Sequence, residues 1–195
     1  MKPIILASKS PRRKELLKQI GFNFDIDPSD YQEEKDLDLK PHEFAKYLSL
    51  QKAKNVAIRH KDSIIIAADT FVVFEGKILG KPSSEEEARM MLNKMSGKSH
   101  SVITGFTIID TETNKVVSKS VETKIYFKNL SPEEINSYIV SKEPMDKAGS
   151  YAIQGLGDIL IEKIEGDYYN VVGLPLTALV EELKNFGIKV LSNRF

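Results

Sequence analysis

The sequence predicts an α/β fold with a mixed, twisted sheet and flanking helices. Segments with helical periodicity alternate with β-rich runs, which is typical of a parallel sheet. A hairpin pattern intrudes into this alternation, because residues 71–74 and 77–79 flank Glu75-Gly76. Two long strand-like segments, 101–110 and 116–127, then follow one another. Hairpins add antiparallel strands to the sheet, so we expect it to be mixed.

The first half of the chain begins with a predicted strand over residues 3–7. Ser10-Pro11 then combines an N-cap residue with proline at the first helical position, which predicts a helix from Pro11 to Ile20 that ends at Gly21. A second helix is predicted to start near Pro41. The apolar run 63–68, which ends on Asp69-Thr70, predicts a central strand that leads into the hairpin.

In the second half, helix start signals again precede apolar periodicity. Ser84 with Glu87, and Ser131 with Glu134, have the spacing of a capping box, so helices are predicted to follow both serines. The remaining predicted elements are a glycine-rich stretch over 148–157, a strand over 159–164 and a last helix over 176–185. We see no repeat and no low-complexity linker, so residues 1–195 are interpreted as a single domain of two lobes.

Composition limits the functions that the chain can have. The 195 residues include no cysteine, which excludes thiolate catalysis and cysteine-ligated zinc and leaves oxygen and nitrogen as metal ligands. Lys+Arg and Asp+Glu number 28 each, so no global field favours nucleic acid or an anionic membrane. No apolar run has the length of a signal peptide or a membrane span, so we expect a cytoplasmic protein without nucleic-acid or membrane partners.

A cluster of polar and basic residues lies where the first predicted strand leads into the first helix. Ser8-Lys9-Ser10-Pro11-Arg12-Arg13 combines hydroxyls, guanidinium groups and the free N–H groups of a helix N-terminus, all of which bind phosphate. The glycine spacing of a Walker loop is missing. On these residues alone, an ordinary capped helix with solvated arginines remains the alternative.

Acidic residues provide a candidate metal site. Asp69 follows the most apolar predicted strand, where open α/β sheets place their ligands, and it is predicted either to hold a metal or to cap a turn. Glu33 and Glu34 would be surface charges unless a divalent ion needs a second carboxylate. Mg²⁺ takes one or two protein carboxylates together with substrate phosphates and water, so one glutamate with Asp69 would suffice.

Three further residues are candidates for substrate contacts. Lys52, beside an apolar helix face, and Lys81, in Gly80-Lys81-Pro82, would place positive charge against phosphate oxygens, although each lysine alone is more often a surface residue. Gln154 lies in the glycine-rich stretch, and its amide offers both a donor and an acceptor for a base edge. A structural loop is the alternative there.

Taken together, the segments of this chain resemble the Maf family of nucleoside triphosphate pyrophosphatases over their whole length. The resemblance is carried, in this order, by Ser8-Lys9-Ser10-Pro11-Arg12-Arg13, Lys52-Ala53, Ala68-Asp69-Thr70, Leu79-Gly80-Lys81-Pro82, Ser96-Gly97 with His100, Glu143-Pro144-Met145-Asp146-Lys147-Ala148-Gly149, Ile153-Gln154-Gly155 and Asn170-Val171-Val172-Gly173-Leu174-Pro175-Leu176.

The resemblance implies a fold like that of inosine triphosphate pyrophosphatases, with a central cleft between two lobes. It implies cleavage between the α and β phosphates, which releases a nucleoside monophosphate and pyrophosphate, as a nucleotide-pool housecleaning activity. It further implies a divalent cation, Mg²⁺ or Mn²⁺, held by Asp69 and Glu33, with Asp69 also the catalytic proton acceptor, and a homodimer. Ser8, Arg12, Arg13, Lys52 and Lys81 match phosphate-contacting positions.

The resemblance also indicates a substrate. Arg12, Thr70 and Gln154 match the branch of the family that acts on dTTP and UTP, so a pyrimidine nucleoside triphosphate is the expected substrate. A branch that prefers 7-methylguanosine triphosphate differs at these three positions and is the alternative enzyme. A nucleotide-binding regulator of septum formation, without turnover, is the alternative of another class.

Overall fold

The computed structural model describes residues 2–33 and 37–190. Two compact units are formed, each from separate stretches of the chain. Unit 1 consists of Met1–Thr70, Thr104–Val121 and Gly173–Phe195, and unit 2 consists of Phe71–Ile103 and Glu122–Val172. Three strands, β3 (Ile64–Phe74), β5 (Ser99–Asp110) and β6 (Val116–Phe127), contribute residues to both units.

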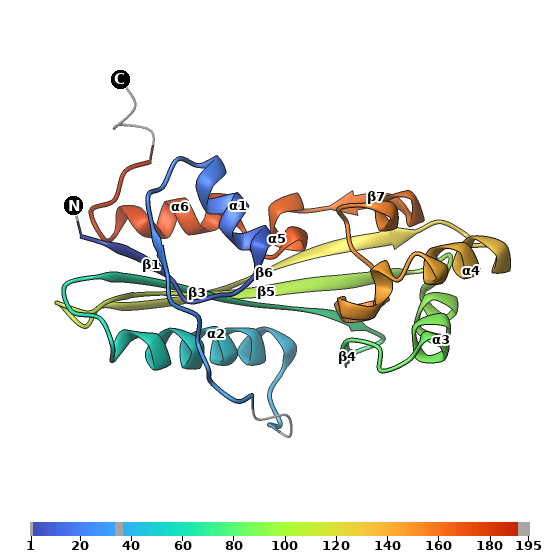
Figure 1. Ribbon diagram of the computed structural model, residues 1–195, viewed down its shortest axis with the longest axis horizontal. Coiled ribbons are helices and arrows are strands. Elements are labelled where there is room, and N and C mark those ends of the chain that lie inside the picture. Colours follow the sequence, from blue (N-terminus) through green and yellow to red (C-terminus); the bar gives the residue numbers. More distant parts are fainter. Residues whose placement is uncertain (1, 34–36, 191–195) are drawn as a thin grey trace. The chain divides into compact units, whose positions relative to one another are not determined.

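The described strands form one mixed sheet in the order β2-β1-β3-β5-β6-β7, with β4 (Lys77–Leu79) paired to β3 (Figure 1). β1 (Ile4–Leu6) pairs in parallel with β2 (Asp25–Ile26) and with β3. The pairs β3–β4 and β6–β7 are antiparallel, where β7 is Ile161–Glu165. The predicted mixed α/β sheet with flanking helices is therefore confirmed.

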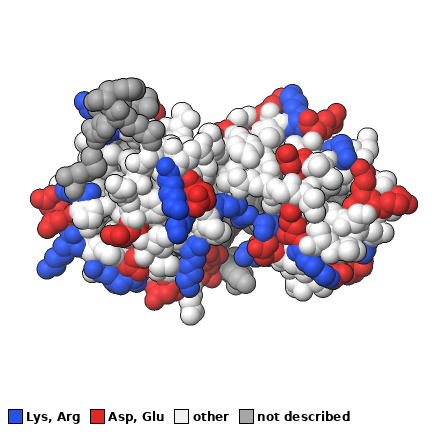
Figure 2. Space-filling model, turned by 45° about the horizontal axis from the view of Figure 1, so that its top comes forward, with Lys and Arg blue, Asp and Glu red and all other residues white. Residues whose placement is uncertain are grey.

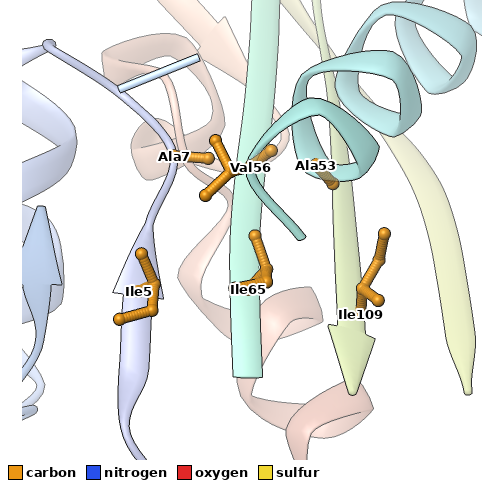
Figure 3. Close-up of a cluster of buried hydrophobic side chains, with 7 residues drawn as sticks. Ile5, Ala7, Ala53, Val56, Ile65 and Ile109 are labelled. Carbon is orange, nitrogen blue, oxygen red and sulfur yellow. The ribbon is translucent and has the colours of Figure 1, made fainter. Parts of the chain in front are cut away.

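In unit 1, helices lie on both faces of the strands (Figure 1). Helix α2 (Pro41–Ala57) covers one face, and α1 (Pro11–Gln19) and α6 (Leu176–Lys184) cover the other. On the α2 face, side chains from three strands and the helix form a buried cluster (Figure 3); its members are Ile5, Ala7, Ala53, Val56, Ile65, Ala67 and Ile109. Burial of this apolar surface fixes α2, and with it the side chains on its flank, against β3.

Unit 2 contains the hairpin β3–β4 and two helices that contact each other, α3 (Glu85–Met95) and α4 (Pro132–Val140). Ser131 begins α4 with both bonds of a capping box, as predicted. At α3 only one of the two predicted bonds is present. Ser84 accepts from the Glu87 N–H, but the Glu87 carboxylate binds the N–H and hydroxyl of Ser83, because Ser83 offers two donors.

The main difference from the sequence prediction is at Asp69-Thr70. These polar residues do not end the central strand; β3 runs through them from Ile64 to Phe74, so the predicted strand and the first arm of the hairpin are one element. Both side chains lie at a partly exposed part of the strand, which lets a polar pair continue the ladder. Asp69 therefore projects from within β3 rather than from its carboxyl end.

Some short elements were not predicted. They are β2, α5 (Tyr168–Val172) and three 3₁₀ helices, η1 (Glu143–Asp146), η2 (Ala148–Ser150) and η3 (Leu156–Leu160). Each is too short to display a hydrophobic period, and tertiary contacts decide its conformation. No helix in residues 2–33 and 37–190 has the length and apolar character that crossing a membrane requires.

Candidate functional site

The predicted phosphate loop folds as a turn that leads into α1. Ser10 is the N-cap, and its hydroxyl accepts from the Arg13 N–H at 3.4 Å. The Ser10 N–H donates to the Ser8 hydroxyl at 3.2 Å, which tightens the turn before the helix. Pro11 occupies the first helical position, where a missing N–H costs nothing. The loop thus presents the N-terminus of α1 together with the side chains of Arg12 and Arg13.

Arg13 connects three segments of unit 1 through its guanidinium group. Nε donates to the Gly173 carbonyl at 2.8 Å, Nη1 to the Ser8 hydroxyl at 3.2 Å and Nη2 to the Thr70 hydroxyl at 3.1 Å. Desolvation lowers the pKa of Arg13 from its usual value, and the negative charge of Asp69 opposes that shift. The structure therefore brings Ser8, Arg13 and Thr70 together, as the prediction of a shared site requires.

Arg12 has a different environment from its neighbour. Its Nε is buried without a hydrogen-bond partner among the residues that the structure describes. A buried guanidinium N–H without a partner is costly, so this donor is available to a ligand that carries acceptor oxygens. Arg12 is consistent with its predicted role in substrate binding, which stays a prediction.

Lys52 joins the two predicted metal ligands. Its Nζ donates to Glu33 Oε1 at 2.6 Å and also to Asp69 Oδ1. Lys52 and Asp69 are mostly buried, with side-chain exposures of 17% and 15%, whereas Glu33 is 44% exposed. Three predicted site residues from α2, β3 and the segment before α2 therefore meet at one point of unit 1.

The segment that carries Glu33 is anchored to the C-terminal end of α2 and to the residues that follow it. Asp27 accepts from Arg59 Nε at 2.9 Å, and His60 Nε2 lies 2.7 Å from the same carboxylate. The hydrogen bonds from Arg59 and then His60 hold the pKa of Asp27 below its usual value. Further along, the Asp30 N–H donates to Asn55 Oδ1 at 3.2 Å. These contacts follow the helix toward Lys52 and bring Glu33 within its reach.

The donor set at Lys52 fits a hard divalent cation. Two carboxylates that converge on one positive charge supply the oxygen ligands that Mg²⁺ prefers, with substrate phosphates and water completing the shell. No cluster of three or more His, Cys, Asp or Glu side chains suited to a metal exists within residues 2–33 and 37–190. Glu34, the alternative ligand to Glu33, lies outside the described residues.

The two remaining predicted residues, Lys81 and Gln154, belong to unit 2, and both are exposed. Their segments are connected by a backbone hydrogen bond, in which the Gly149 N–H donates to the Gly80 carbonyl at 3.0 Å. This bond places the loop that carries Lys81 beside the glycine-rich stretch that carries Gln154. The roles of both residues stay predictions.

Sequence reasoning missed the groups that organise these side chains. Thr70 Oγ1 lies 2.9 Å from Thr104 Oγ1 and 3.4 Å from the Gly173 carbonyl that Arg13 also binds. No sequence pattern distinguishes Thr104 as a site residue, because it lies in a strand rich in β-branched residues. Gly173, in contrast, is in one of the segments that carry the family resemblance. The carboxylate of Glu143, which also lies in a segment that carries the resemblance but was assigned no role, accepts hydrogen bonds from the backbone N–H groups of Leu156 and Gly157.

Charges of both signs are interspersed on one face of the molecule. On the face drawn in Figure 2, basic and acidic side chains alternate, in agreement with the balance of 28 Lys+Arg and 28 Asp+Glu. The face drawn in Figure 2 therefore offers an anion no extended basic surface.

Comparison with known proteins identifies the family of this chain. The model of a family described as Maf-like protein matches residues 3–186. The chain belongs to the Maf family. A dTTP/UTP pyrophosphatase of Bacillus cereus (strain G9842) is 51% identical over 190 residues, which cover 97% of this chain and 98% of that protein. A dTTP/UTP pyrophosphatase of Carboxydothermus hydrogenoformans is 53% identical over 184 residues, which cover 94% and 98%.

Among solved structures, the Staphylococcus aureus Ham1 protein is similar to this Maf chain with a TM-score of 0.49. The alignment has 14% sequence identity and covers 82% of this chain and 80% of that one.

Proposed function

We propose that this Maf chain hydrolyses dTTP and UTP to the nucleoside monophosphate and pyrophosphate, and so removes these nucleotides from the pool. The observation that supports this most strongly is the identity of about half of all residues, over nearly the full length, with proteins named dTTP/UTP pyrophosphatase. The site supports it chemically, because carboxylates, a mostly buried ammonium and guanidinium groups are collected in unit 1.

In the proposed reaction, a water oxygen forms a bond to the α phosphorus while the bond from that phosphorus to the bridging oxygen breaks. The pyrophosphate takes the bond electrons, and the water proton passes to the Asp69 carboxylate. Lys52 holds that carboxylate in place through Oδ1. Arg12 and the N–H groups at the start of α1 stabilise the charge of the phosphates.

A divalent cation, Mg²⁺ or Mn²⁺, is part of the proposal. Asp69 and Glu33 would hold it, since Lys52 already brings oxygen atoms of both carboxylates to one point. Such an ion, when bound, polarises phosphoryl oxygens and neutralises developing negative charge.

For the substrate, we propose that Arg12, Thr70 and Gln154 select pyrimidine nucleotides, and that Ser8, Arg13, Lys52 and Lys81 contact phosphates. Thr70 is held by Arg13, so the groups proposed for selection and for phosphate contact are physically connected within unit 1. A cytoplasmic location and a homodimer complete the proposal; light scattering of the purified protein tests the dimer, and a monomer mass at micromolar concentration would contradict it.

The decisive experiment incubates the protein with UTP and Mg²⁺ and identifies the products. We expect UMP and pyrophosphate, whereas UDP and orthophosphate would contradict the proposal. If the protein hydrolysed 7-methylguanosine triphosphate faster than UTP, the alternative substrate assignment would be correct.

Asp69→Asn tests the proton acceptor. The amide keeps the shape of the side chain but cannot take a proton, so we expect turnover to fall by about 100-fold or more. Calorimetry should still detect UTP binding. Asp62→Asn, at an exposed position of the same unit, is the matched control and should keep full activity. Tight UTP binding without product, equal in the wild-type and Asp69→Asn proteins, would instead favour a regulatory binder.

A further inference from the structure

The segment around Gln154 is held by an unusual carboxylate. Glu143 Oε1 accepts from the Tyr138 hydroxyl and from the Gly157 N–H, both at 2.9 Å, and Oε2 accepts from the Leu156 N–H at 2.9 Å. All of these groups belong to unit 2. A partly buried carboxylate that accepts from three donors is a strong anchor, because hydrogen bonds to a charged acceptor are stronger than hydrogen bonds between neutral groups.

The anchor extends to the residues before Gln154. The Tyr138 hydroxyl, besides donating to Glu143, accepts from the Ala152 N–H at 3.3 Å. Tyr151 is buried, and its hydroxyl lies 2.7 Å from Nε2 of the buried His100. Main chain on both sides of Gln154 is therefore fixed, while the Gln154 side chain itself is exposed.

Gly155 shows how closely the carboxylate and this segment fit. Its φ of +98° lies in a region that side chains other than hydrogen rarely adopt. A Cβ at this position would lie 2.6 Å from Glu143 Oε2. The backbone of Gly155, directly after Gln154, therefore packs closely against the Glu143 carboxylate, and only glycine leaves room for it.

We propose that Glu143 is a positioning residue for Gln154: by fixing the backbone of residues 152–157, its carboxylate sets the direction in which the Gln154 amide meets the nucleotide base. This inference rests on the proposed pyrimidine nucleotide activity. An amide that recognises a base edge discriminates only when its donor and acceptor are correctly aimed, because a misdirected amide leaves polar groups unpaired.

Glu143→Gln is the sharpest test, since it keeps the size of the side chain. The amide of the variant retains one acceptor oxygen, but its NH₂ group faces a backbone N–H. Two donors then face each other, and one of the anchoring hydrogen bonds is lost. We expect amide exchange of Leu156 and Gly157, followed by mass spectrometry in the absence of nucleotide, to accelerate about tenfold. Glu162→Gln, an exposed glutamate of β7, is the matched control and should leave this exchange unchanged.

The functional readout is discrimination between UTP and GTP by kcat/KM. In Glu143→Gln this ratio should fall about tenfold, mainly through a higher KM for UTP, as it should in Gln154→Ala. Because both changes act on one contact, the double variant should discriminate no worse than Gln154→Ala alone. A purely structural role of Glu143 would lower stability without changing the ratio.

The outcomes separate this inference from the function on which it rests. Failure of the wild-type protein to hydrolyse UTP would overturn the proposed function. The role of Glu143 would be overturned, with that function intact, if Glu143→Gln left the amide exchange or the UTP/GTP ratio of kcat/KM unchanged. It would also be overturned if the losses of the two single variants multiplied in the double variant. If Glu143→Gln does not fold, Tyr138→Phe removes one donor and keeps the carboxylate, and it should shift exchange and discrimination in the same direction by a smaller factor.

Discussion

Arg12 and Arg13 are neighbours in the sequence but differ in what their guanidinium groups contact. Arg13 donates to Gly173, Ser8 and Thr70, while Arg12 Nε has no partner among the described residues. From the sequence, Arg13 was predicted to be a general phosphate contact. The structure adds that Arg13 also organises the site, a role that no local pattern reveals because its partners are up to 160 positions away.

Arg13→Lys should therefore cost stability as well as activity. Lysine cannot reproduce the planar fork that reaches three acceptors, so we expect the free energy of unfolding to fall by about 1–3 kcal/mol. Arg12→Lys is the matched control and should change it by no more than about 0.5 kcal/mol. Urea titration of both proteins measures the difference, and an equal loss in the two variants would contradict the assignment.

The cluster of Lys52, Asp69 and Glu33 shows which site residues and contacts can be predicted from the sequence. Asp69 was singled out by its place after an apolar run, and Lys52 by its place one turn after Leu48 on an apolar helix face. Both side chains meet in the structure. Their meeting with Glu33 depended on the path of residues 27–33 along α2, which is set by Asp27, Asn55, Arg59 and His60 and has no periodic signal.

At the scale of elements, the long and periodic segments were predicted well. β6 was predicted with the observed bounds, and the helices that begin at Pro11 and Pro41 start where their prolines indicate. The failure at Asp69-Thr70 has a definite cause. A polar pair ends an apolar run in sequence, but a strand continues wherever its backbone remains paired, and pairing is a tertiary property.

At Gly105 the backbone of β5 lies close against the backbone of α2, and both belong there to unit 1. A Cβ on Gly105 would overlap the carbonyl of Ala45. Gly105→Ala should therefore force the helix away from the strand and destabilise the protein by about 1–3 kcal/mol. Thermal and urea unfolding measure this loss.

Gly80→Ala is the control for that prediction, because nothing lies within 4 Å of its added methyl group. Its stability should stay within about 0.5 kcal/mol of the wild type. If both alanine variants were equally stable, α2 would not be packed against β5 as described.

For the molecule as a whole, the free energy of unfolding should depend on pH through His100. Its side chain is buried against Phe127 and Tyr151, and burial lowers its pKa to about 4. In the unfolded chain a histidine titrates near pH 6.5. Between these values the unfolded state binds a proton that the native state does not, so stability is lost as the pH falls below about 6.5.

Chemical denaturation at pH 6.5 and pH 5 tests this dependence. The wild-type protein should lose about 1–2 kcal/mol over this interval from His100, which is above the range in which most carboxylates titrate. The His100→Asn protein cannot bind this proton, so its free energy of unfolding should fall correspondingly less between pH 6.5 and pH 5, whatever its stability at pH 6.5. Equal losses in the two proteins would show that His100 is accessible to protons in the native state.

The division into two units has a consequence for biosynthesis. Unit 1 begins with the first residues of the chain but also requires Gly173–Phe195, which include Leu179 and Leu183, both fully buried. Domains usually fold in order as the ribosome releases them, the N-terminal one first. Here the N-terminal stretch cannot complete its core until the last helix has been translated, whereas every part of unit 2 has been synthesised by then. Vectorial synthesis therefore makes every residue of unit 2 available for folding before Leu179 and Leu183, which complete the core of unit 1.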